Sequence, residues 1–221
     1  MTPELIVFDF DGVLVDSEVI SNEVVAAALT ELDYSVSVAD CHRRFTGLKL
    51  ETIRAQIEAE LGRPLSPRLE ALVRDESYRR LGSELQMVRG ADALLGGLQG
   101  PRCIASNSSP RWIELGLRAT GLEPFFRPEV RFSAAHVAQG KPAPDVFIHA
   151  AASMQVDPTV CVVIEDSIHG VRAALTAGMR VLGFTGASHI AEGHAAILRE
   201  AGVEAVFDDL MRLPDLLRRI S

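Results

Sequence analysis

The sequence predicts an α/β fold in which an open parallel sheet forms one domain and a helical domain is inserted into it. Two patterns in the chain predict this fold. Short apolar runs that end in small or polar residues alternate with stretches of helical periodicity, as in strands joined by crossover helices. Residues 17 to about 86 interrupt the alternation, because they have helical periodicity and no apolar run of the strand type.

The first predicted strand spans Leu5–Phe10, where the sequence is LIVFDF. A nearly continuous apolar run of this length is typical of a strand that is buried on both faces of a parallel sheet. Three further runs also end in polar or small residues, at 102–109, 160–167 and 180–186. Helices are predicted between them at 110–120, 143–154 and 168–177, and a weak strand at 204–207 precedes a closing helix. The sheet is therefore Rossmann-like, and ligands of such sheets bind outside the carboxyl ends of the strands.

The inserted domain is predicted to consist of amphipathic helices, at residues 17–33, 49–61 and 67–80. We place this domain at residues 16–86, so that residues 1–15 and 87–221 form the sheet domain. A helical domain inserted at the strand ends can act as a cap, which opens to admit a substrate and closes to exclude water.

The composition of the chain excludes several classes of protein. A formal charge of −8 argues against a protein that binds the nucleic-acid backbone. The three cysteines lie far apart, which indicates neither a disulfide framework nor a thiolate metal site. No apolar run approaches the roughly 20 residues that span a bilayer, and the amino terminus lacks a signal-peptide pattern, so we expect a cytoplasmic protein without membrane association. An acidic protein that handles an anion needs a cation, which indicates a bound metal ion.

Asp9 and Asp11 lie two residues apart where the first strand ends. In an extended chain this spacing places both side chains on the same side. Two neighbouring carboxylates repel each other unless a divalent cation neutralises them or one stays protonated and serves as an acid. Gly12 follows and allows the backbone to turn sharply beside a ligand. An ordinary acidic turn is the alternative, but two charges at the end of an apolar strand are costly without a function.

A second pair of acids, Glu165 and Asp166, ends the third apolar run. Because parallel strands have their carboxyl ends at one edge of the sheet, all four acids should meet there. Carboxylate oxygens are the ligands that Mg²⁺ prefers. The sequence therefore predicts a magnesium site formed by Asp9, Asp11, Glu165 and Asp166. The alternative, that Asp166 and Ser167 cap the next helix, remains compatible with metal binding by Glu165 alone.

A hydroxyl-rich segment follows the second apolar run. It contains Ser106 and Asn107, and it leads to Pro110, where a helix is predicted to begin. Backbone N–H groups at a helix start, together with a hydroxyl, form a cradle for a phosphate group. The same residues also match a plain helix N-cap, so both interpretations stay open.

Lys141 lies between a glycine and a proline that hold its backbone, a few residues before a predicted helix. A lysine at this point could supply the positive charge that an acidic protein needs at an anion site. A solvated loop lysine is the alternative.

The six histidines show neither HExxH nor another ligand spacing, and we assign them to the surface or the core. The chain also lacks a Ser-His-Asp order and a GxSxG segment, which argues against a serine hydrolase.

Four segments together resemble the motifs of the haloacid dehalogenase superfamily. In chain order they are FDFDGVLVDSE (8–18), ASNSS (105–109), GKPAPDVF (140–147) and IEDSIHG (164–170). The chain is most similar to the branch with a helical cap after the first motif, which contains sugar-phosphate phosphatases and β-phosphoglucomutase. The resemblance covers about residues 4–186 and implies a Mg²⁺-dependent phosphoryl-transfer enzyme.

The resemblance implies a role for each acid. Asp9 would be the nucleophile that forms an aspartyl-phosphate. Asp11 would protonate the leaving oxygen, activate the hydrolytic water and lend its backbone carbonyl to the metal ion. Glu165 and Asp166 would complete the magnesium site together with the Asp9 carboxylate.

The resemblance also implies the phosphate contacts. Ser106 and the neighbouring Asn107 amide would hold the transferring phosphoryl group, and Lys141 would offset charge on that group and on Asp9. Phosphoryl transfer requires positioning and charge neutralisation above all, so these roles agree with the chemistry of the residues.

Smaller features favour hydrolysis of a phosphate ester. Family members that act as dehalogenases generally lack the second aspartate, and Asp11 is present. A β-phosphoglucomutase carries a cap histidine and a cap arginine, where this chain has Ser21 and no arginine in residues 47–50. Thr46, Gly47 and Lys49 look similar to the specificity loop of sugar-phosphate phosphatases, including those that take 6-phosphogluconate.

Three functions therefore stand as hypotheses. The leading one is a phosphatase that acts on a small phosphorylated sugar or sugar acid. A phosphosugar mutase is the second, because the core motifs are shared. A non-catalytic binding or regulatory protein is the third, since fold alone does not fix function. The sequence leaves open whether the chain is a monomer or a homodimer.

Overall fold

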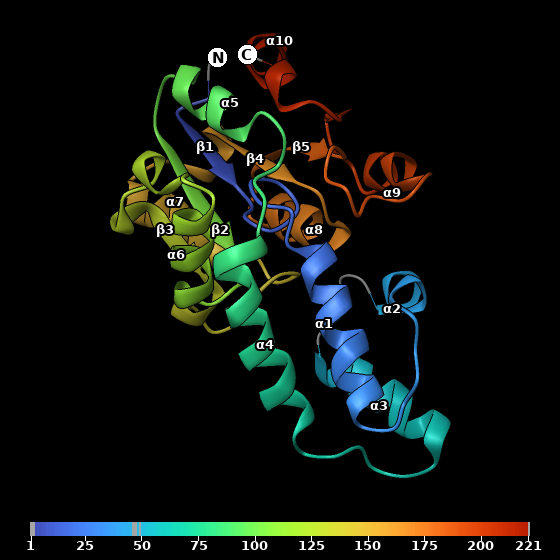
Figure 1. Cartoon of the computed structure of the whole chain (residues 1–221). Helices are drawn as coiled ribbons and strands as arrows, with labels where there is room; N and C mark the ends of the chain where they lie inside the picture. Colours follow the sequence, from blue (N-terminus) through green and yellow to red (C-terminus); the bar gives the residue numbers. More distant parts are fainter. Residues whose placement is uncertain (1–2, 46–47, 49, 221) are drawn as a thin grey trace. The chain divides into compact units, whose positions relative to one another are not determined.

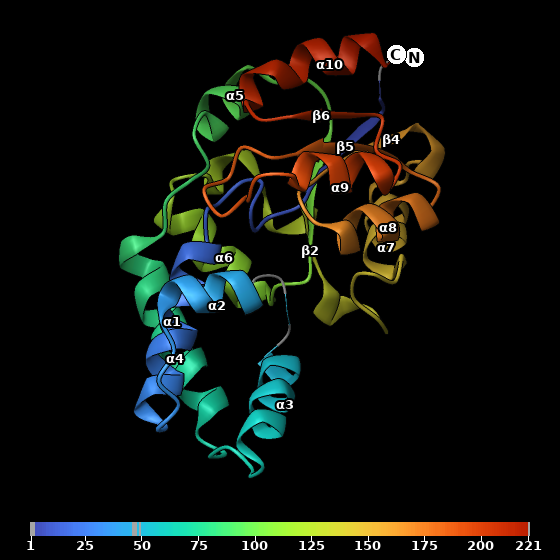
Figure 2. The same ribbon diagram turned by 90° about the vertical axis from the view of Figure 1, so that its right-hand side faces the viewer.

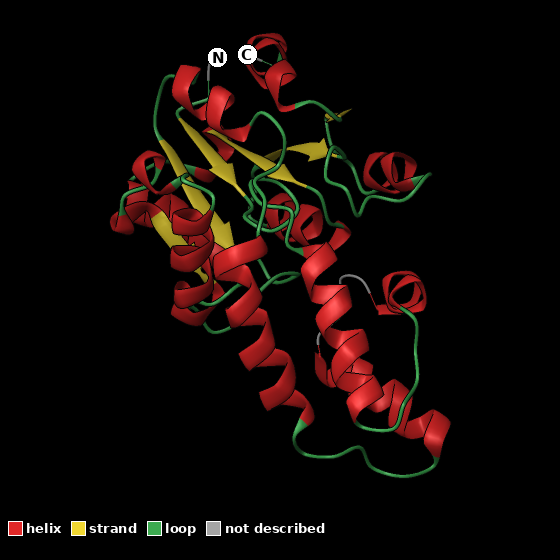
Figure 3. Cartoon of the chain, in the orientation of Figure 1, coloured by secondary structure: helices red, strands yellow, loops and turns green. Residues whose placement is uncertain are grey.

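The computed structural model describes residues 3–45, 48 and 50–220 and confirms the predicted α/β class. Six parallel strands form one sheet in the order β3-β2-β1-β4-β5-β6. The strands are β1 (Leu5–Phe8), β2 (Arg102–Ser106), β3 (Arg131–Ser133), β4 (Cys161–Glu165), β5 (Arg180–Phe184) and β6 (Ala205–Phe207). Figure 3 shows the strands side by side with helices around them. Since all pairs are parallel, every strand has its carboxyl end at the same edge.

The first strand lies in the middle of the sheet. Val7 is paired with Cys103 of β2 on one side and with Val163 of β4 on the other. All four residues of β1 are buried, which matches the continuous apolar run expected for a strand covered on both faces. The central position of β1 brings the residue after it, Asp9, between the ends of β2 and β4.

The helices of the sheet domain follow the strands along the chain. They are α5 (Ala91–Gly97), α6 (Pro110–Ala119), α7 (Asp145–Met154), α8 (Ile168–Thr176), α9 (His194–Glu200) and α10 (Leu213–Arg219). Figures 1 and 2 show them from two sides. One core cluster joins alternate residues of the sheet, such as Val7 and Val163, to Phe147 of α7 and Val171 of α8. This packing fixes the starts of α7 and α8 relative to the strand ends.

The chain divides into two compact units, and each has a core of its own. Residues 1–16 and 86–221 form the unit with the sheet, and residues 17–85 form a helical unit. The boundaries expected from the sequence differ by one residue at each joint. The helical unit contains α1 (Glu18–Glu31), α2 (Val38–Phe45), α3 (Leu50–Leu61) and α4 (Leu69–Glu84). Its core includes Leu29, Phe45 and Ile57.

Some elements were not expected from the sequence. Strand β3 has only three residues, too few for a periodic pattern, and it forms because β2 supplies a partner on its edge. Helices α2, α5 and α9 are 7 or 8 residues long, and such short helices depend on tertiary packing more than on their own propensity. In the part of the chain that the structure describes, no helix has the length and apolar character needed to cross a membrane.

Candidate active site

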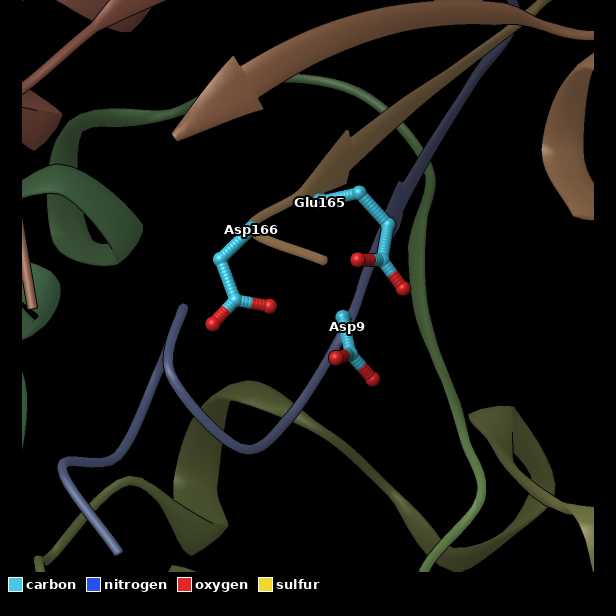
Figure 4. A group of neighbouring side chains, drawn as sticks. All are labelled: Asp9, Glu165 and Asp166. Atoms are coloured by element: carbon cyan, nitrogen blue, oxygen red, sulfur yellow. The ribbon is translucent and has the colours of Figure 1, made fainter. Parts of the chain in front are cut away.

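Three buried carboxylates meet at the carboxyl edge of the sheet. Asp9 follows β1, Glu165 ends β4 and Asp166 comes next in the chain. One oxygen from each of the three lies within 4.8 Å of the others. Figure 4 shows the three carboxyl groups facing a common point. The strand-end acids expected to come together are therefore neighbours, apart from the side chain of Asp11.

Burial makes this group of acids costly. Burial raises the pKa of Asp9 well above its ordinary value, and the charges of Glu165 and Asp166 act in the same direction. The pKa of Asp166 is also raised, mainly because that carboxyl is removed from water. The group therefore favours either protonation or a bound cation in the space between its oxygens.

Lys141 is the one ammonium group in contact with these acids among the described residues. Its Nζ donates hydrogen bonds to Asp9 Oδ1 and to Glu165 Oε1, both at 2.8 Å. Burial by itself would lower the pKa of the ammonium, but the attraction of the two carboxylates outweighs burial and raises it. The Nζ also lies 4.8 Å from the ring centroid of Phe147. Lys141 is buried, with 5% of its surface exposed. The alternative of a solvated loop lysine is therefore wrong.

The donor set fits a divalent metal ion. Three carboxylates face one ammonium, so the positive charge falls short even with Lys141 fully protonated. The donors are hard oxygens, which Mg²⁺ and Ca²⁺ prefer. Asp9, Glu165 and Asp166 can therefore hold such an ion between them.

Glu165 is the most firmly held of the three acids. Its Oε1 accepts from Lys141, and its Oε2 accepts from the backbone N–H of Ser167 at 2.8 Å and from the Ser167 hydroxyl at 3.0 Å. A Cβ at Gly170 would come within 1.6 Å of Oε1, so the carboxylate lies directly on the helix backbone. Ser167 also caps α8, since its hydroxyl accepts from Gly170 N. Ser167 thus caps α8 and also donates hydrogen bonds to Glu165 of the acid group.

The side chain of Asp11 lies apart from the acid group. Its Oδ2 accepts a hydrogen bond of 2.5 Å from the hydroxyl of Ser108, and its Oδ1 accepts one of 2.9 Å from the indole N–H of Trp112. Both donors come from the segment after β2 and the start of α6. The sequence predicted that the side chains of Asp9 and Asp11 point to the same side. It did not predict that Asp11 is paired with Ser108 and Trp112.

The segment after β2 is shaped by local hydrogen bonds. Ser106 is buried, and its hydroxyl accepts a hydrogen bond of 3.0 Å from Ser108 N. Ser109 caps α6, since its hydroxyl accepts from Trp112 N. The N-cap alternative is therefore realised at Ser109, and it leaves Ser106 at the strand end beside β1.

Asn107 ties this segment to the loop of Lys141. Its Oδ1 accepts from Lys141 N at 2.8 Å, and its Nδ2 donates to the Lys141 carbonyl at 3.1 Å. A Cβ at Gly140 would approach Asn107 Oδ1 to 2.6 Å, so a glycine is needed for this contact. The Asn107 side chain therefore positions the backbone of Lys141, a contact that the sequence pattern did not predict.

Two histidines that were assigned to the surface or core contact Asp166. His189 Nε2 lies 3.2 Å from Asp166 Oδ2, and His194 Nε2 lies 2.5 Å from the Asp166 carbonyl oxygen. Ligand-spacing patterns could not find them, because both lie in the segment after β5, far from the acids in sequence. The one signal in the sequence is that both histidines follow β5, the strand that pairs with β4.

The three cap residues predicted to contact substrate, Thr46, Gly47 and Lys49, lie outside the described residues. Their role stays a prediction.

Comparisons with known proteins agree with one another. The model of the haloacid dehalogenase-like hydrolase family matches residues 3–178. The 6-phosphogluconate phosphatase of Escherichia coli K12 is 32% identical over 187 residues, which cover 84% of each chain.

Two solved structures share nearly the whole fold. A conserved haloacid dehalogenase-like protein of unknown function from Agrobacterium tumefaciens is 42% identical, with a TM-score of 0.89 and 98% of both chains covered. A hydrolase from Deinococcus radiodurans, solved with bound phosphate and sodium, is 28% identical, with a TM-score of 0.81 over 99% of this chain and 96% of that one.

Proposed function

Because this chain belongs to the haloacid dehalogenase-like hydrolase family, we propose that it is a Mg²⁺-dependent phosphatase of a small phosphorylated sugar or sugar acid. The observation that carries the proposal is the buried group of Asp9, Glu165 and Asp166 at the carboxyl edge of the sheet, in which Asp9 and Glu165 accept hydrogen bonds from the Lys141 ammonium. This arrangement combines a carboxylate nucleophile with the positive charge that an anionic substrate requires.

Asp9 acts as the nucleophile in this proposal. One of its carboxylate oxygens attacks phosphorus, a new O–P bond forms, and the bond from phosphorus to the ester oxygen of the substrate breaks. The product alcohol leaves, and the phosphoryl group stays on Asp9 as an acyl phosphate. Water then attacks this phosphorus, inorganic phosphate departs, and the Asp9 carboxylate is restored.

Asp11 moves the protons. Its carboxyl group protonates the leaving oxygen in the first step, and the resulting carboxylate takes a proton from the attacking water in the second. The hydrogen bonds from Ser108 and Trp112 support this role, because they hold both oxygens of Asp11 in place.

The transferring phosphoryl group is held by Ser106, the Asn107 backbone amide and Lys141. The hydroxyl and the amide lie at the end of β2, next to the end of β1 that carries Asp9. Lys141 already contacts Asp9 Oδ1, so its charge lies beside the atom that attacks. Asn107 supports this charge indirectly by holding the Lys141 backbone.

Mg²⁺ would be held by the carboxylates of Asp9, Glu165 and Asp166 and by the backbone carbonyl of Asp11. When bound, it supplies positive charge that lowers repulsion between the acids and the phosphate dianion. The shortage of positive charge around the three buried acids supports this assignment.

The substrate class rests on the relatives and on the cap. The relative from Escherichia coli carries the name 6-phosphogluconate phosphatase, which motivates a sugar-acid phosphate as the first candidate. Thr46, Gly47 and Lys49 are proposed to contact the sugar part of the substrate.

The test is a steady-state assay with p-nitrophenyl phosphate and a panel of sugar phosphates in the presence of Mg²⁺. We expect multiple turnovers, and we expect Asp9→Asn to lower kcat by on the order of 10³-fold or more, because the amide is no nucleophile. Asp92→Asn is the matched control, since Asp92 is exposed in the first turn of α5. Full activity of Asp9→Asn, or no hydrolysis of any ester, rejects the proposal.

Phosphorus NMR separates the two remaining hypotheses. A mutase would convert glucose 1-phosphate with its bisphosphate activator to the 6-phosphate faster than it releases inorganic phosphate. A binding protein would produce neither the 6-phosphate nor inorganic phosphate. We expect inorganic phosphate to appear first.

A further inference from the structure

The segment between β5 and α9 brings two imidazole rings to Asp166. His189 Nε2 lies 3.2 Å from Asp166 Oδ2, and the side chains of both residues are about one-tenth exposed, at 9% and 8%. His194 is the first residue of α9, and its Nε2 lies 2.5 Å from the Asp166 carbonyl oxygen. One residue of the acid group is thus contacted at its side chain and at its backbone by the same segment.

The chemistry of the acceptors places the ring protons. A backbone carbonyl can only accept a hydrogen bond, so His194 Nε2 must carry the hydrogen in this contact. When a cation is bound, Asp166 is ionised and also only accepts, so His189 Nε2 then donates to Asp166 Oδ2. Both rings therefore act as donors toward Asp166.

The backbone of Gly12 packs against the same oxygen, Asp166 Oδ2, on another side. Gly12 has a φ of +79°, and a Cβ on it would lie 2.0 Å from Asp166 Oδ2 and 3.0 Å from His189 Cε1. The oxygen Oδ2 is thus packed between Gly12 and the imidazole of His189. Figure 4 shows that one oxygen of Asp166 is turned toward Asp9 and Glu165 and the other away from them.

All three buried acids are contacted by the nitrogen atom of a basic side chain. Asp9 and Glu165 both accept hydrogen bonds from Lys141 Nζ. Asp166 has no such bond to Lys141 and instead faces the imidazole of His189. Each buried carboxylate therefore has at least one oxygen engaged by a nitrogen donor, and Glu165 has both. Donors that engage one oxygen of a ligating carboxylate fix its orientation and tune its affinity for a metal ion.

We propose that His189 is a positioning residue that holds Asp166 by Oδ2 and thereby directs Oδ1 to the bound Mg²⁺, while His194 fixes the backbone of Asp166. The inference rests on the metal site of the proposed function and adds to it two residues outside the four motif segments. His189 acts on the ion through Asp166 and contacts neither the substrate nor the reacting atoms.

The first experiment measures Mg²⁺ binding by calorimetry on metal-stripped protein without substrate. We expect His189→Ala to weaken Mg²⁺ affinity about 10- to 100-fold, the usual effect of removing such a donor. His189→Gln keeps an N–H at a similar reach and should restore affinity to within about threefold of the wild type. His169→Ala is the matched control, because His169 is exposed on α8. An affinity of His189→Ala within about twofold of wild type overturns the proposal, since that falls below the expected loss.

Kinetics give a second readout that a merely structural role would not produce. The Mg²⁺ concentration for half-maximal activity should rise in His189→Ala by the same factor as the dissociation constant, while kcat at saturating Mg²⁺ stays within about threefold of wild type. A large loss of kcat that excess Mg²⁺ does not restore contradicts a role through metal affinity.

A measurement on the wild-type chain covers the case in which His189→Ala does not fold. Proton–nitrogen correlation spectra of the histidine rings should show the His189 signals shifting as Mg²⁺ is added, while the His169 signals stay in place. Unchanged His189 signals at saturating Mg²⁺ overturn the proposal.

The outcomes separate this inference from the proposed function. Wild-type protein that binds Mg²⁺ but hydrolyses no phosphate ester rejects the phosphatase and leaves the role of His189 intact. An active phosphatase whose Mg²⁺ affinity is indifferent to His189 rejects only the inference. Absence of Mg²⁺ binding by the wild type rejects the inference as well.

Discussion

At the scale of single residues, the three buried acids differ in how their oxygens are engaged. Glu165 accepts three hydrogen bonds, from Lys141 and twice from Ser167, whereas Asp9 and Asp166 each have one oxygen in the contacts described above. The charge of Asp166 lacks an ammonium partner at hydrogen-bond distance in the described residues. Burial of Asp166 therefore carries a free-energy cost when no metal ion is bound, and it raises the pKa of this carboxyl.

This cost predicts that metal-free Asp166→Asn is more stable than the metal-free wild type at neutral pH. Burial raises the pKa of Asp166 in the folded protein, so the unfolded chain loses this proton first as pH rises. Stability associated with the neutral acid is complete below the ordinary aspartate pKa of about 3.9 and is lost as pH rises through the raised folded value. The amide stays neutral and avoids this loss, by on the order of 1 kcal/mol.

Urea denaturation in excess chelator measures the difference at neutral pH and at about pH 5. The advantage of Asp166→Asn should shrink at the lower pH, and added Mg²⁺ should stabilise the wild type far more than the variant. A variant that is less stable than the wild type in chelator at neutral pH would show that the hydrogen bond from His189 outweighs burial.

At the scale of elements, the turn after β1 is built so that backbone lies against the acid at the end of β4. Gly12 has a φ of +79°, in the left-handed region that favours glycine, and the space where its side chain would lie is filled by Asp166. The two strands are neighbours in the sheet, which is why the turn of one meets the residue after the other. Two requirements, backbone conformation and close approach, thus coincide at a single glycine.

Gly12→Ala and Gly178→Ala separate these two requirements. Gly178 has nearly the same φ, +80°, but a Cβ there meets no atom within 4 Å. We expect Gly178→Ala to cost about 1–2 kcal/mol of unfolding free energy from backbone strain alone, with Mg²⁺ affinity unchanged. Gly12→Ala should cost more and should weaken Mg²⁺ binding at least about tenfold, because its methyl group displaces the Asp166 carboxylate. Equal effects of the two substitutions on Mg²⁺ binding would contradict this account.

At the scale of the whole molecule, the two units have separate hydrophobic cores and one unit carries the acid group. Cys41 is buried in the core of the helical unit, and Cys103 and Cys161 are buried in the core of the sheet unit. Burial raises the pKa of all three thiols, to about 11 for Cys161. Reaction of each thiol with a labelling reagent therefore reports the opening of the unit that contains it.

We expect Mg²⁺ to slow the labelling of Cys103 and Cys161 more than that of Cys41. A ligand that binds only the folded sheet unit stabilises that unit against opening, by an amount set by its concentration relative to its Kd. Mass spectrometry after timed exposure to a thiol reagent, with and without Mg²⁺, measures the three rates. Equal slowing at all three cysteines would show that the two units open together. Faster labelling of the sheet-unit thiols with Mg²⁺ would contradict binding at the strand ends.

The sequence by itself determined the fold class and which segments meet at the candidate site. Continuous apolar runs mark buried parallel strands, and parallel strands end at one edge, so Asp9, Ser106 and Glu165 had to lie near each other. Local patterns are sufficient for such conclusions, because periodicity and strand direction are properties of short segments. The motifs also indicated the family that the comparison over residues 3–178 then showed.

Only the tertiary structure decided how the side chains are paired. Asp11 is paired with Ser108 and Trp112, and Asp166 is contacted by His189 and His194. These contacts depend on the paths of loops after other strands and on side-chain rotamers, which no local periodicity specifies. The same physics that gathers acids at the strand ends therefore leaves their individual partners to the packing of the whole sheet unit.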